Sequence, residues 1–265
     1  MSTDTEQEQK PEVTAPSDLP QVAHKESWLE IVKTIVYALL IAAVVRTFVF
    51  QPFNIPSGSM EDTLLVGDYL FVSKTAYGYS KHSFPFSLAP FSGRVFGSDP
   101  ERGDIVVFKL PADNSTDYIK RVIGLPGDRV QVTNGVVYLN GKPLHRDQIS
   151  ASVEFLDGME KYVVHYRETL PSGRSYEVLA SAPDNPLNNT DVFVVPEGHY
   201  FMMGDNRDNS ADSRSPSSGV RYVPAENLVG KAEIIFFSTD GSAHIWEIWQ
   251  WPFAIRYSRL GNLLG

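Results

Sequence analysis

The longest apolar stretch of the chain lies near its start, at residues 28–50, and contains no Gly or Pro. Its middle, residues 34–45, is a run of 12 uncharged residues. Twelve helical residues extend only ~18 Å, whereas the whole stretch extends ~35 Å and can cross the ~30 Å hydrocarbon core of a bilayer if Lys33 and Arg46 reach its two surfaces. The pattern therefore predicts a membrane-spanning helix at 28–50; a buried core helix and an interfacial amphipathic helix are the alternatives.

The segment before this helix differs from a cleaved secretory signal. Residues 1–27 are polar and acidic rather than positively charged, and no Ala-x-Ala site follows the apolar run. We expect 1–27 to be a disordered acidic tail, because it cannot bury enough apolar surface to offset the entropy lost on ordering. Lys25 and Lys33 are offset by Glu26 and Glu30, so the positive-inside rule hardly decides the orientation of the helix.

From Gln51 onward the hydrophobic pattern is that of short strands, and helical periodicity is scarce apart from a turn at 224–228. Asn134-Gly135 and Asn140-Gly141 lie between apolar segments and are strong signals for two-residue hairpins. Pro126-Gly127 marks a further turn. The fold class is therefore mainly β, with predicted strands at 105–110, 118–123, 130–133, 192–195, 200–203 and 232–237.

Three further segments stand apart from this pattern. Residues 77–100, rich in Ser, Phe, Pro and Gly, and residues 148–189, with strands of their own, are interpreted as insertions into the β domain. Near the C-terminus, Trp246, Trp249 and Trp251 fall within six residues. Clustered Trp is typical of a membrane interface, but it is equally typical of a packed core, so both interpretations stay open.

Composition excludes several classes of function. Lys+Arg number 23 against 32 Asp+Glu, a net charge of −9, and no basic run is present, which disfavours a nucleic-acid partner. Without Cys the chain has no disulfide, thiol nucleophile or Cys-ligated metal. The six His show no metal-ligand spacing, and the Gly-containing segments match no nucleotide-binding motif. We therefore expect neither a metal nor a cofactor.

Three polar segments are candidates for chemistry. Ser57 and Ser59 flank a Gly shortly after the apolar helix, although such a turn is usually a flexible loop. Lys120 and Arg121 are adjacent on a predicted strand and so point to opposite faces; such a Lys commonly protects an edge strand. Residues 204–214 form a loop of alternating acids and arginines, which either is solvated or positions a site.

Together these segments resemble one family, the bacterial type I signal peptidases, also called leader peptidases. PSGSMEDTLLVGDYLFVSK, RGDIVVFKLP, YIKRVIGLPGD and GDNRDNSADSR occur in the family's order after the apolar helix, and the resemblance extends over about 28–240. Ser-Gly-Ser-Met alone would be weak, since self-cleaving repressors also use a Ser/Lys pair. The resemblance implies a mainly β protease domain with an inserted β subdomain, which cleaves signal peptides after small, Ala-x-Ala-like residues.

The resemblance also implies roles for individual residues. Ser59 would be the nucleophile and Lys120 its general base, while Ser57 and the Ser59 backbone N–H would form the oxyanion hole. Ser210 would orient the lysine amine. The other supporting residues are Asp205, Asp212, Arg214 and Arg121, and the substrate would lie along Ile55, Pro56, Tyr118 and Ile119. A lysine of ordinary pKa is neutral only about once in ~2,500 molecules at pH 7, so the mechanism requires Lys120 to lose its hydration.

The implied location is the bacterial cytoplasmic membrane, crossed once at 28–50, with the 1–27 tail cytoplasmic and the 51–265 domain extracytoplasmic. The expected partners are preprotein signal peptides, membrane lipid and the secretion translocon. The chain departs from the family in two ways. Some members carry a disulfide in the inserted region, which a chain without Cys cannot form, and residues 212–222 differ from the commonest sequence of the family. Another Ser/Lys peptidase and a non-catalytic membrane-tethered β module are the alternatives; a repressor would need a DNA-binding domain that the acidic tail cannot hold.

Overall fold

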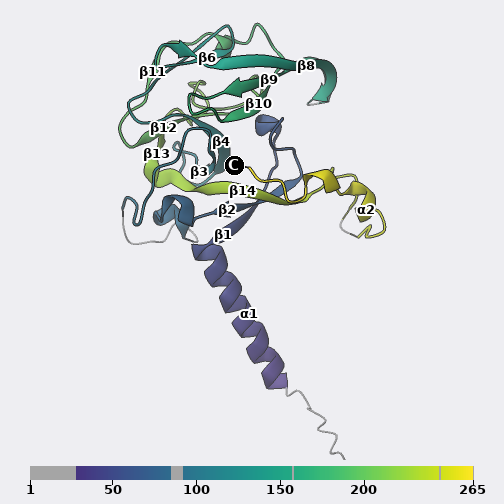
Figure 1. Cartoon of the computed structure of the whole chain (residues 1–265). Helices are drawn as coiled ribbons and strands as arrows, with labels where there is room; N and C mark the ends of the chain where they lie inside the picture. Colours follow the sequence, from purple (N-terminus) through teal and green to yellow (C-terminus); the bar gives the residue numbers. More distant parts are fainter. Residues whose placement is uncertain (1–27, 85–91, 157, 245, 265) are drawn as a thin grey trace, which may run out of the picture. The chain divides into compact units, whose positions relative to one another are not determined.

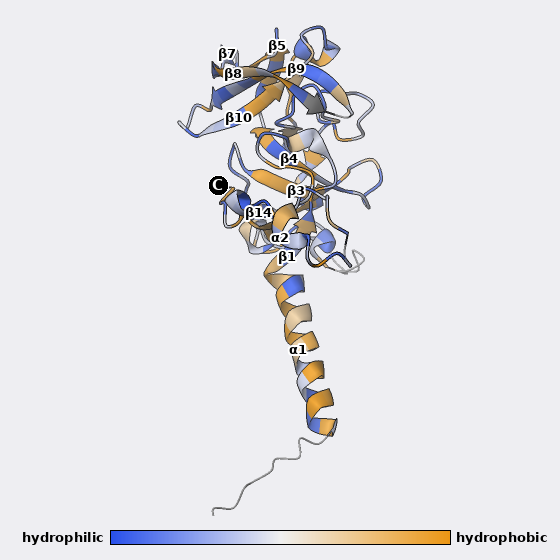
Figure 2. Cartoon of the chain, turned by 90° about the vertical axis from the view of Figure 1, so that its right-hand side faces the viewer, coloured by the Kyte–Doolittle hydropathy of each residue, from blue (hydrophilic) through white to orange (hydrophobic). Residues whose placement is uncertain are grey.

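The computed structural model describes residues 28–84, 92–156, 158–244 and 246–264, so the tail predicted at 1–27 and part of the 77–100 segment lie outside it. The chain divides into two units, Met1–Ile41 and Ala42–Gly265. The boundary falls within helix α1 (Trp28–Phe48), which buries none of its residues and is apolar along most of its length (Figure 2). Among the described residues it is the one helix long and apolar enough to cross a membrane, extending ~31 Å.

The helix ends at Phe48 and not at Phe50 as predicted, because Phe50 already begins strand β1 (Phe50–Asn54). Pro52 explains the difference. Its ring would collide with the carbonyl of Phe48 in a continuing helix, and the residue before a proline is disfavoured in the helical conformation. The chain therefore leaves the helix and enters the sheet within two residues.

The first sheet has seven strands, and each strand is antiparallel to its neighbours (Figure 1). This sheet confirms the mainly β prediction, although β2 is a strand that the pattern did not indicate. In spatial order the strands are β1, β2 (Asp68–Ser73), β14 (Leu228–Ser238), β3 (Ile105–Lys109), β4 (Asp117–Gly124), β12 (His199–Met203) and β13 (Val223–Pro224).

Two smaller sheets follow the middle of the chain. One contains β11 (Phe193–Val194), β5 (Arg129–Thr133), β6 (Val136–Leu139) and β7 (Lys142–Pro143). Its two hairpin turns are those predicted, with positive φ at Asn134, Gly135, Asn140 and Gly141. The other contains β10 (Ser175–Ala180), β9 (Met159–Thr169) and β8 (His145–Leu156), so the segment interpreted as an insertion at 148–189 builds a sheet of its own.

The described helices besides α1 are one short α-helix and several single 3-10 turns. They are α2 (Trp251–Ala254), η1 (Gly58–Met60), η2 (Thr75–Tyr77), η3 (Lys81–Ser83), η5 (Pro186–Asn188), η6 (Ala225–Asn227) and η7 (Tyr257–Arg259). Around α2 the three tryptophans are exposed: Trp246 by 69%, Trp249 by 66% and Trp251 by 43%. The interpretation of this cluster as core packing is therefore wrong.

The apolar core beneath the seven-stranded sheet includes side chains from the Ser-Gly-Ser segment itself. Ile55, Met60 and Leu64 are buried there, and Phe53 and Ile119 pack against the same cluster. Anchors on both sides of Ser57 and Ser59 hold that segment in one position, so the flexible-loop interpretation is wrong. The sequence around the serines folds locally because its apolar residues point into the sheet.

Candidate active site

Ser59 lies on the single turn η1, in the middle of the anchored segment. Ser57 precedes this turn in an extended conformation, with φ −134° and ψ 150°, and Met60 closes it with a fully buried side chain. The first N–H groups of such a turn have no partner within it. The hydroxyl of Ser57 lies 3.5 Å from that of Ser59, so two hydroxyl groups lie side by side at the start of this turn.

Lys120 lies on β4, an interior strand between β3 and β12. Its side chain is 3% exposed, so its interpretation as the protector of an edge strand is wrong. The amine Nζ lies 2.6 Å from Ser59 Oγ and donates to the carbonyl of Ile119 at 2.9 Å. The structure thus brings together a serine hydroxyl and a lysine amine that are 61 residues apart in the sequence.

Burial lowers the pKa of Lys120 to about 8, against the opposing influence of the Asp212 and Asp205 carboxylates, which favour the ammonium form. At pH 7 roughly one molecule in ten then carries a neutral amine, compared with about one in ~2,500 for an ordinary lysine. A neutral amine within hydrogen-bond distance of a hydroxyl can accept its proton.

Arg121 points to the opposite face of β4 and anchors the 204–214 loop. Its guanidinium binds both carboxylate oxygens of Asp205, at 2.8 and 2.6 Å, and donates to the carbonyl of Gly103 at 2.8 Å. Thr63, four residues after the nucleophile candidate, donates to the same carboxylate at 2.5 Å. Asp205 therefore links the Lys120 strand to the Ser59 segment.

Asp212 is fully buried and forms the second ion pair of the loop. It accepts the Gly204 N–H at 3.0 Å and the Arg214 guanidinium at 3.0 and 2.8 Å. Burial alone would raise its pKa, but Arg214 and the backbone N–H groups hold the pKa below the usual range. Ser218, within the stretch that departs from the family, donates to the Asp212 carbonyl at 2.7 Å. The loop is a buried, charge-paired scaffold, and its interpretation as a solvated loop is wrong.

Ser210 lies beside the nucleophile candidate but does not make the expected bond to Lys120. Its hydroxyl is buried and has no hydrogen-bond partner among the described residues. A Cβ added to Gly204 would come within 2.2 Å of Ser210 Oγ and 2.4 Å of the Ser59 carbonyl oxygen, which shows how closely these three residues pack. The lysine amine instead donates to Ser59 and Ile119.

Residues that the sequence interpretation missed also position Ser59. The Asn206 side-chain amide donates to the Gly58 carbonyl at 3.1 Å, and its backbone N–H donates to that of Ser59 at 3.3 Å. Arg207 forms a buried pair with Glu168 of β9, at 2.8 and 2.6 Å. Asn206 and Arg207 lie in the quoted GDNRDNSADSR segment, a signal that could have identified them. Glu168 has no such signal in its surroundings.

The expected substrate-binding residues lie next to two unpaired strand edges. The outer edge of β1 has no strand partner among the described residues, and β12 pairs with β4 only over 121–124, which leaves 117–119 unpaired on that side. Ile55 is buried, Tyr118 and Ile119 are half-buried, and Pro56 is exposed. Unpaired edges offer backbone N–H and C=O groups to an extended peptide.

A serine hydroxyl beside a buried amine of lowered pKa is the arrangement of a serine hydrolase. Residues 28–237 match the family model described as signal peptidase, peptidase S26. The chain therefore belongs to the S26 family of signal peptidases, and it is a mainly β peptidase with an N-terminal apolar helix.

Two relatives from Rickettsia agree with this assignment. Signal peptidase I of Rickettsia prowazekii (strain Madrid E) is 46% identical over 211 residues, covering 77% of this chain and 78% of the relative. That of Rickettsia canadensis (strain McKiel) is 44% identical over 215 residues, covering 78% and 79%. A crystal structure of a signal peptidase I from Enterococcus faecalis V583 is 27% identical and covers 51% of this chain and 97% of its own length, with a TM-score of 0.31.

Proposed function

We propose that this chain is a membrane-anchored serine endopeptidase that removes N-terminal signal peptides from translocated preproteins, with Ser59 as nucleophile and Lys120 as general base. The observation that supports this most directly is the 2.6 Å separation between Lys120 Nζ and Ser59 Oγ, at a lysine whose burial lowers its pKa to about 8. The hydroxyl gains a base that works near neutral pH without a histidine.

In the first half of the reaction, the neutral amine takes the Ser59 proton as Oγ attacks the scissile carbonyl carbon. The tetrahedral oxyanion then accepts hydrogen bonds from the Ser57 hydroxyl and the Ser59 backbone N–H. As the C–N bond breaks, the lysine ammonium returns its proton to the leaving amine. In the second half, Lys120 takes a proton from the water that attacks the acyl-enzyme, and it passes this proton to Ser59 Oγ as the bond between Oγ and the acyl carbon breaks.

The supporting residues keep these groups in register. Arg121 with Asp205 and Arg214 with Asp212 are buried ion pairs whose disruption would leave unpaired charges beside the dyad. Ser210 contributes a hydroxyl next to the Ser59 backbone, and we propose that it binds the lysine amine once Ser59 is acylated and the Ser59–Lys120 bond is lost. That role accounts for a buried hydroxyl without a partner in the free enzyme.

The substrate is proposed to bind as an added strand between the free edge of β1 and residues 117–119. Backbone pairing would supply most of the affinity, because it is independent of sequence. Branched side chains at Ile55 and Ile119, beside Pro56 and Tyr118, would line the pockets and restrict the positions before the cut to small residues. This agrees with Ala-x-Ala-like specificity.

The proposed setting is the bacterial cytoplasmic membrane, with the tail cytoplasmic and the 51–265 domain extracytoplasmic. Ser59 follows Phe48 by 11 residues, so the intervening chain spans at most ~40 Å and keeps the active site near the membrane. A signal peptide has its apolar core in that bilayer, and the translocon would deliver it there. The exposed Trp246, Trp249 and Trp251 would contact lipid.

The contact with lipid is tested on a form of the chain that starts at Val49 and lacks the helix. It should still sediment with phospholipid vesicles and be stimulated by detergent. Replacing the three tryptophans by Ser should weaken both effects by roughly tenfold, since each buries apolar surface at the interface. Circular dichroism checks the fold. If the form starting at Val49 ignores vesicles altogether, the tryptophans play no part in attachment.

The cleavage reaction is tested with a model preprotein, using mass spectrometry to locate the cut. The proposal predicts one product whose signal peptide ends in a small residue, formed equally well with EDTA present. The matched forms Ser59→Ala and Lys120→Ala must give no product. Cleavage at scattered positions would indicate another Ser/Lys peptidase. Absence of cleavage at any pH would indicate a non-catalytic β module. Loss of cleavage with EDTA would indicate a different mechanism.

A further inference from the structure

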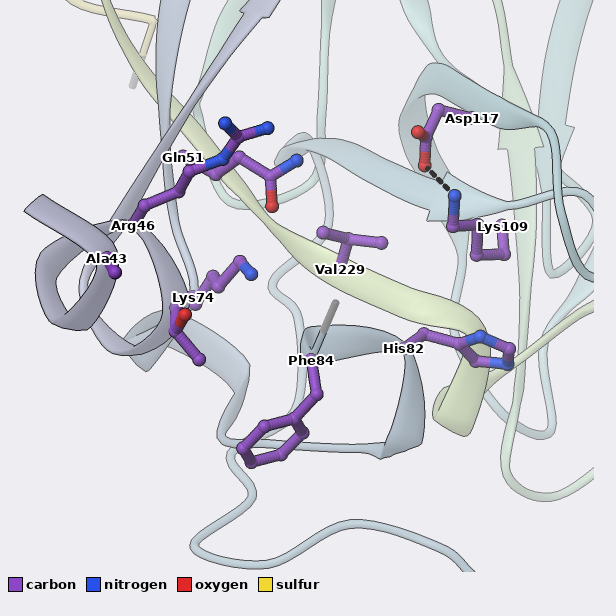
Figure 3. A pocket seen from close by; sticks show the side chains of 10 residues that line it. Ala43, Arg46, Gln51, Lys74, His82, Phe84, Lys109, Asp117 and Val229 are labelled. Carbon is purple, nitrogen blue, oxygen red and sulfur yellow. Dashed lines mark ion pairs between the residues drawn. The ribbon is translucent and has the colours of Figure 1, made fainter. Parts of the chain in front are cut away.

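A cavity of about 470 Å³ lies away from Ser59, and most of the residues that line it are polar or charged. This volume is within the ~300–1,000 Å³ range of small-molecule sites. It opens between the last turn of α1, residues 43–47, and one face of the seven-stranded sheet. Figure 3 shows Arg46, Gln51 and Lys74 on one side of it, and Lys109, Asp117 and His82 on the other.

The cavity is cationic in a chain whose net charge is −9. Its lining contains Arg46, Lys74 and Lys109 but a single carboxylate, Asp117, among the described residues. That carboxylate is already paired with Lys109, at 3.0 Å. The lining therefore carries three cations and one carboxylate, and Arg46 and Lys74 have no ion-pair partner of their own among the described residues.

Lys74 is the unusual member of this group. Its side chain is 3% exposed, and its Nζ donates to the carbonyl of Ser83 at 2.5 Å. Burial and the positive charge of Arg46 together lower its pKa to about 8, although the carboxylate of Asp117 opposes this shift. Burying an amine next to a second cation is unfavourable unless an anion compensates the charges. The site is organised for an anion.

The position of Arg46 narrows the choice of anion. Arg46 lies in the last turn of the proposed membrane-spanning helix, so it would lie at the level of the lipid headgroups. The apolar side chains of α1 are exposed and would be in contact with acyl chains.

We propose that this cavity binds the phosphodiester of an acidic phospholipid headgroup, held by Arg46 and Lys74 with Lys109 at its rim. The guanidinium can bind two phosphate oxygens at once, and the buried amine supplies a charge-assisted hydrogen bond. The proposal goes beyond the peptidase reaction, although it rests on the proposed membrane anchoring. Bound lipid would fix the β domain at the bilayer surface independently of the tryptophans.

The experiment measures lipid binding to the full chain in detergent micelles by native mass spectrometry. Three probes are titrated: a short-chain phosphatidylglycerol, a phosphatidylcholine with the same acyl chains, and inorganic phosphate. We expect a single saturable phosphatidylglycerol adduct, with the phosphatidylcholine at least tenfold weaker. Equal binding of the two lipids overturns the proposal. So does inorganic phosphate that displaces phosphatidylglycerol at equal concentration, because the site would then be for a free anion.

Substitutions in the lining test whether the lipid binds in this cavity. Arg46→Gln should raise the Kd for phosphatidylglycerol by about threefold to tenfold, and Arg46→Gln with Lys74→Gln by tenfold or more. Arg46 is exposed, so its variant keeps the proposal testable if Lys74→Gln fails to fold. The control is Lys81→Gln, a nearby cation that pairs with Glu226 and does not line the cavity; its Kd should change less than twofold.

An unchanged Kd in both Arg46 forms rejects the site. No arm of the experiment requires cleavage. The binding result therefore stands whether or not Ser59 and Lys120 act as proposed, and an inactive Ser59→Ala form serves equally well as the protein under test.

Discussion

Two lysines of this molecule have nearly the same exposed fraction and the same lowered pKa. Lys120 and Lys74 are each 3% exposed, and burial lowers the pKa of each to about 8. Their partners differ. The Lys120 amine lies 2.6 Å from the Ser59 hydroxyl, whereas the Lys74 amine donates to the Ser83 carbonyl.

The difference shows that a lowered lysine pKa does not by itself indicate a general base. A hydroxyl has a proton to give and a carbonyl has none, so only Lys120 can start a reaction. The surrounding charges also differ: the carboxylates of Asp212 and Asp205 oppose the shift at Lys120, whereas at Lys74 the cations Arg46 and Lys109 reinforce it and only Asp117 opposes it. These differences fit the roles proposed for the two regions, proton transfer at Lys120 and binding of an anion beside Lys74.

The largest expected effect is loss of the dyad. Ser59→Ala, Lys120→Ala and Lys120→Arg should each lower kcat/KM by ~10⁴-fold or more, because nucleophile and base act as one unit and a guanidinium does not release its proton in this range. Rates of preprotein cleavage measure this, with circular dichroism as the control for folding. Appreciable turnover by Lys120→Arg would show that Lys120 is not a general base, so it would no longer differ from Lys74 in that respect.

Ser57→Ala should have the next largest effect, lowering kcat by ~10²–10³-fold with KM little changed, since the lost donor acts mainly in the transition state. Steady-state kinetics separate the two constants. Ser80→Ala, a buried serine that caps the η3 turn outside the site, provides a comparison for the general cost of removing a hydroxyl. A rise in KM alone would mean that Ser57 contacts substrate instead.

Gly204→Ala should lower kcat by ~10–10²-fold. Its new Cβ would lie 2.4 Å from the Ser59 carbonyl oxygen, so the nucleophile segment has to shift, and small displacements of reacting groups are costly. Gly97→Ala, whose φ is outside the left-handed region and whose new Cβ would meet no atom nearer than 3.6 Å, tests whether any Gly replacement is harmful. An active Gly204→Ala form with unchanged kcat would show that the Ser59 position tolerates movement.

The smallest expected effect concerns pH. For the free enzyme, kcat/KM should rise with pH through a midpoint near 8, because the neutral form of Lys120 is the active one. Asp212→Asn should move this midpoint to lower pH, since the lost carboxylate favours the ammonium form. Lys74→Arg should leave the midpoint where it is. If Lys74→Arg does shift the midpoint, the group that titrates is Lys74 and not Lys120.

Local sequence patterns predicted a large part of the fold. The hairpins at Asn134-Gly135 and Asn140-Gly141 are confirmed because a two-residue turn depends on the backbone conformation of those residues alone. The end of α1 was missed by two residues although Pro52 is a local signal. β2 was missed because its apolar residues form one short continuous run, which periodicity alone does not assign to a strand; it is defined by pairing with β1 and β14.

What the sequence determined by itself is the set of elements and the chemical types of the candidate residues: an apolar helix, short strands, Ser59, Lys120 and a charged loop. Tertiary structure alone decided which of these groups meet. The Ser59–Lys120 contact spans 61 residues, and the Asn206–Gly58 contact spans 148. It also decided that Lys120 and Lys74 are both buried, because hydration of a side chain depends on every segment packed around it and not on its neighbours in the chain.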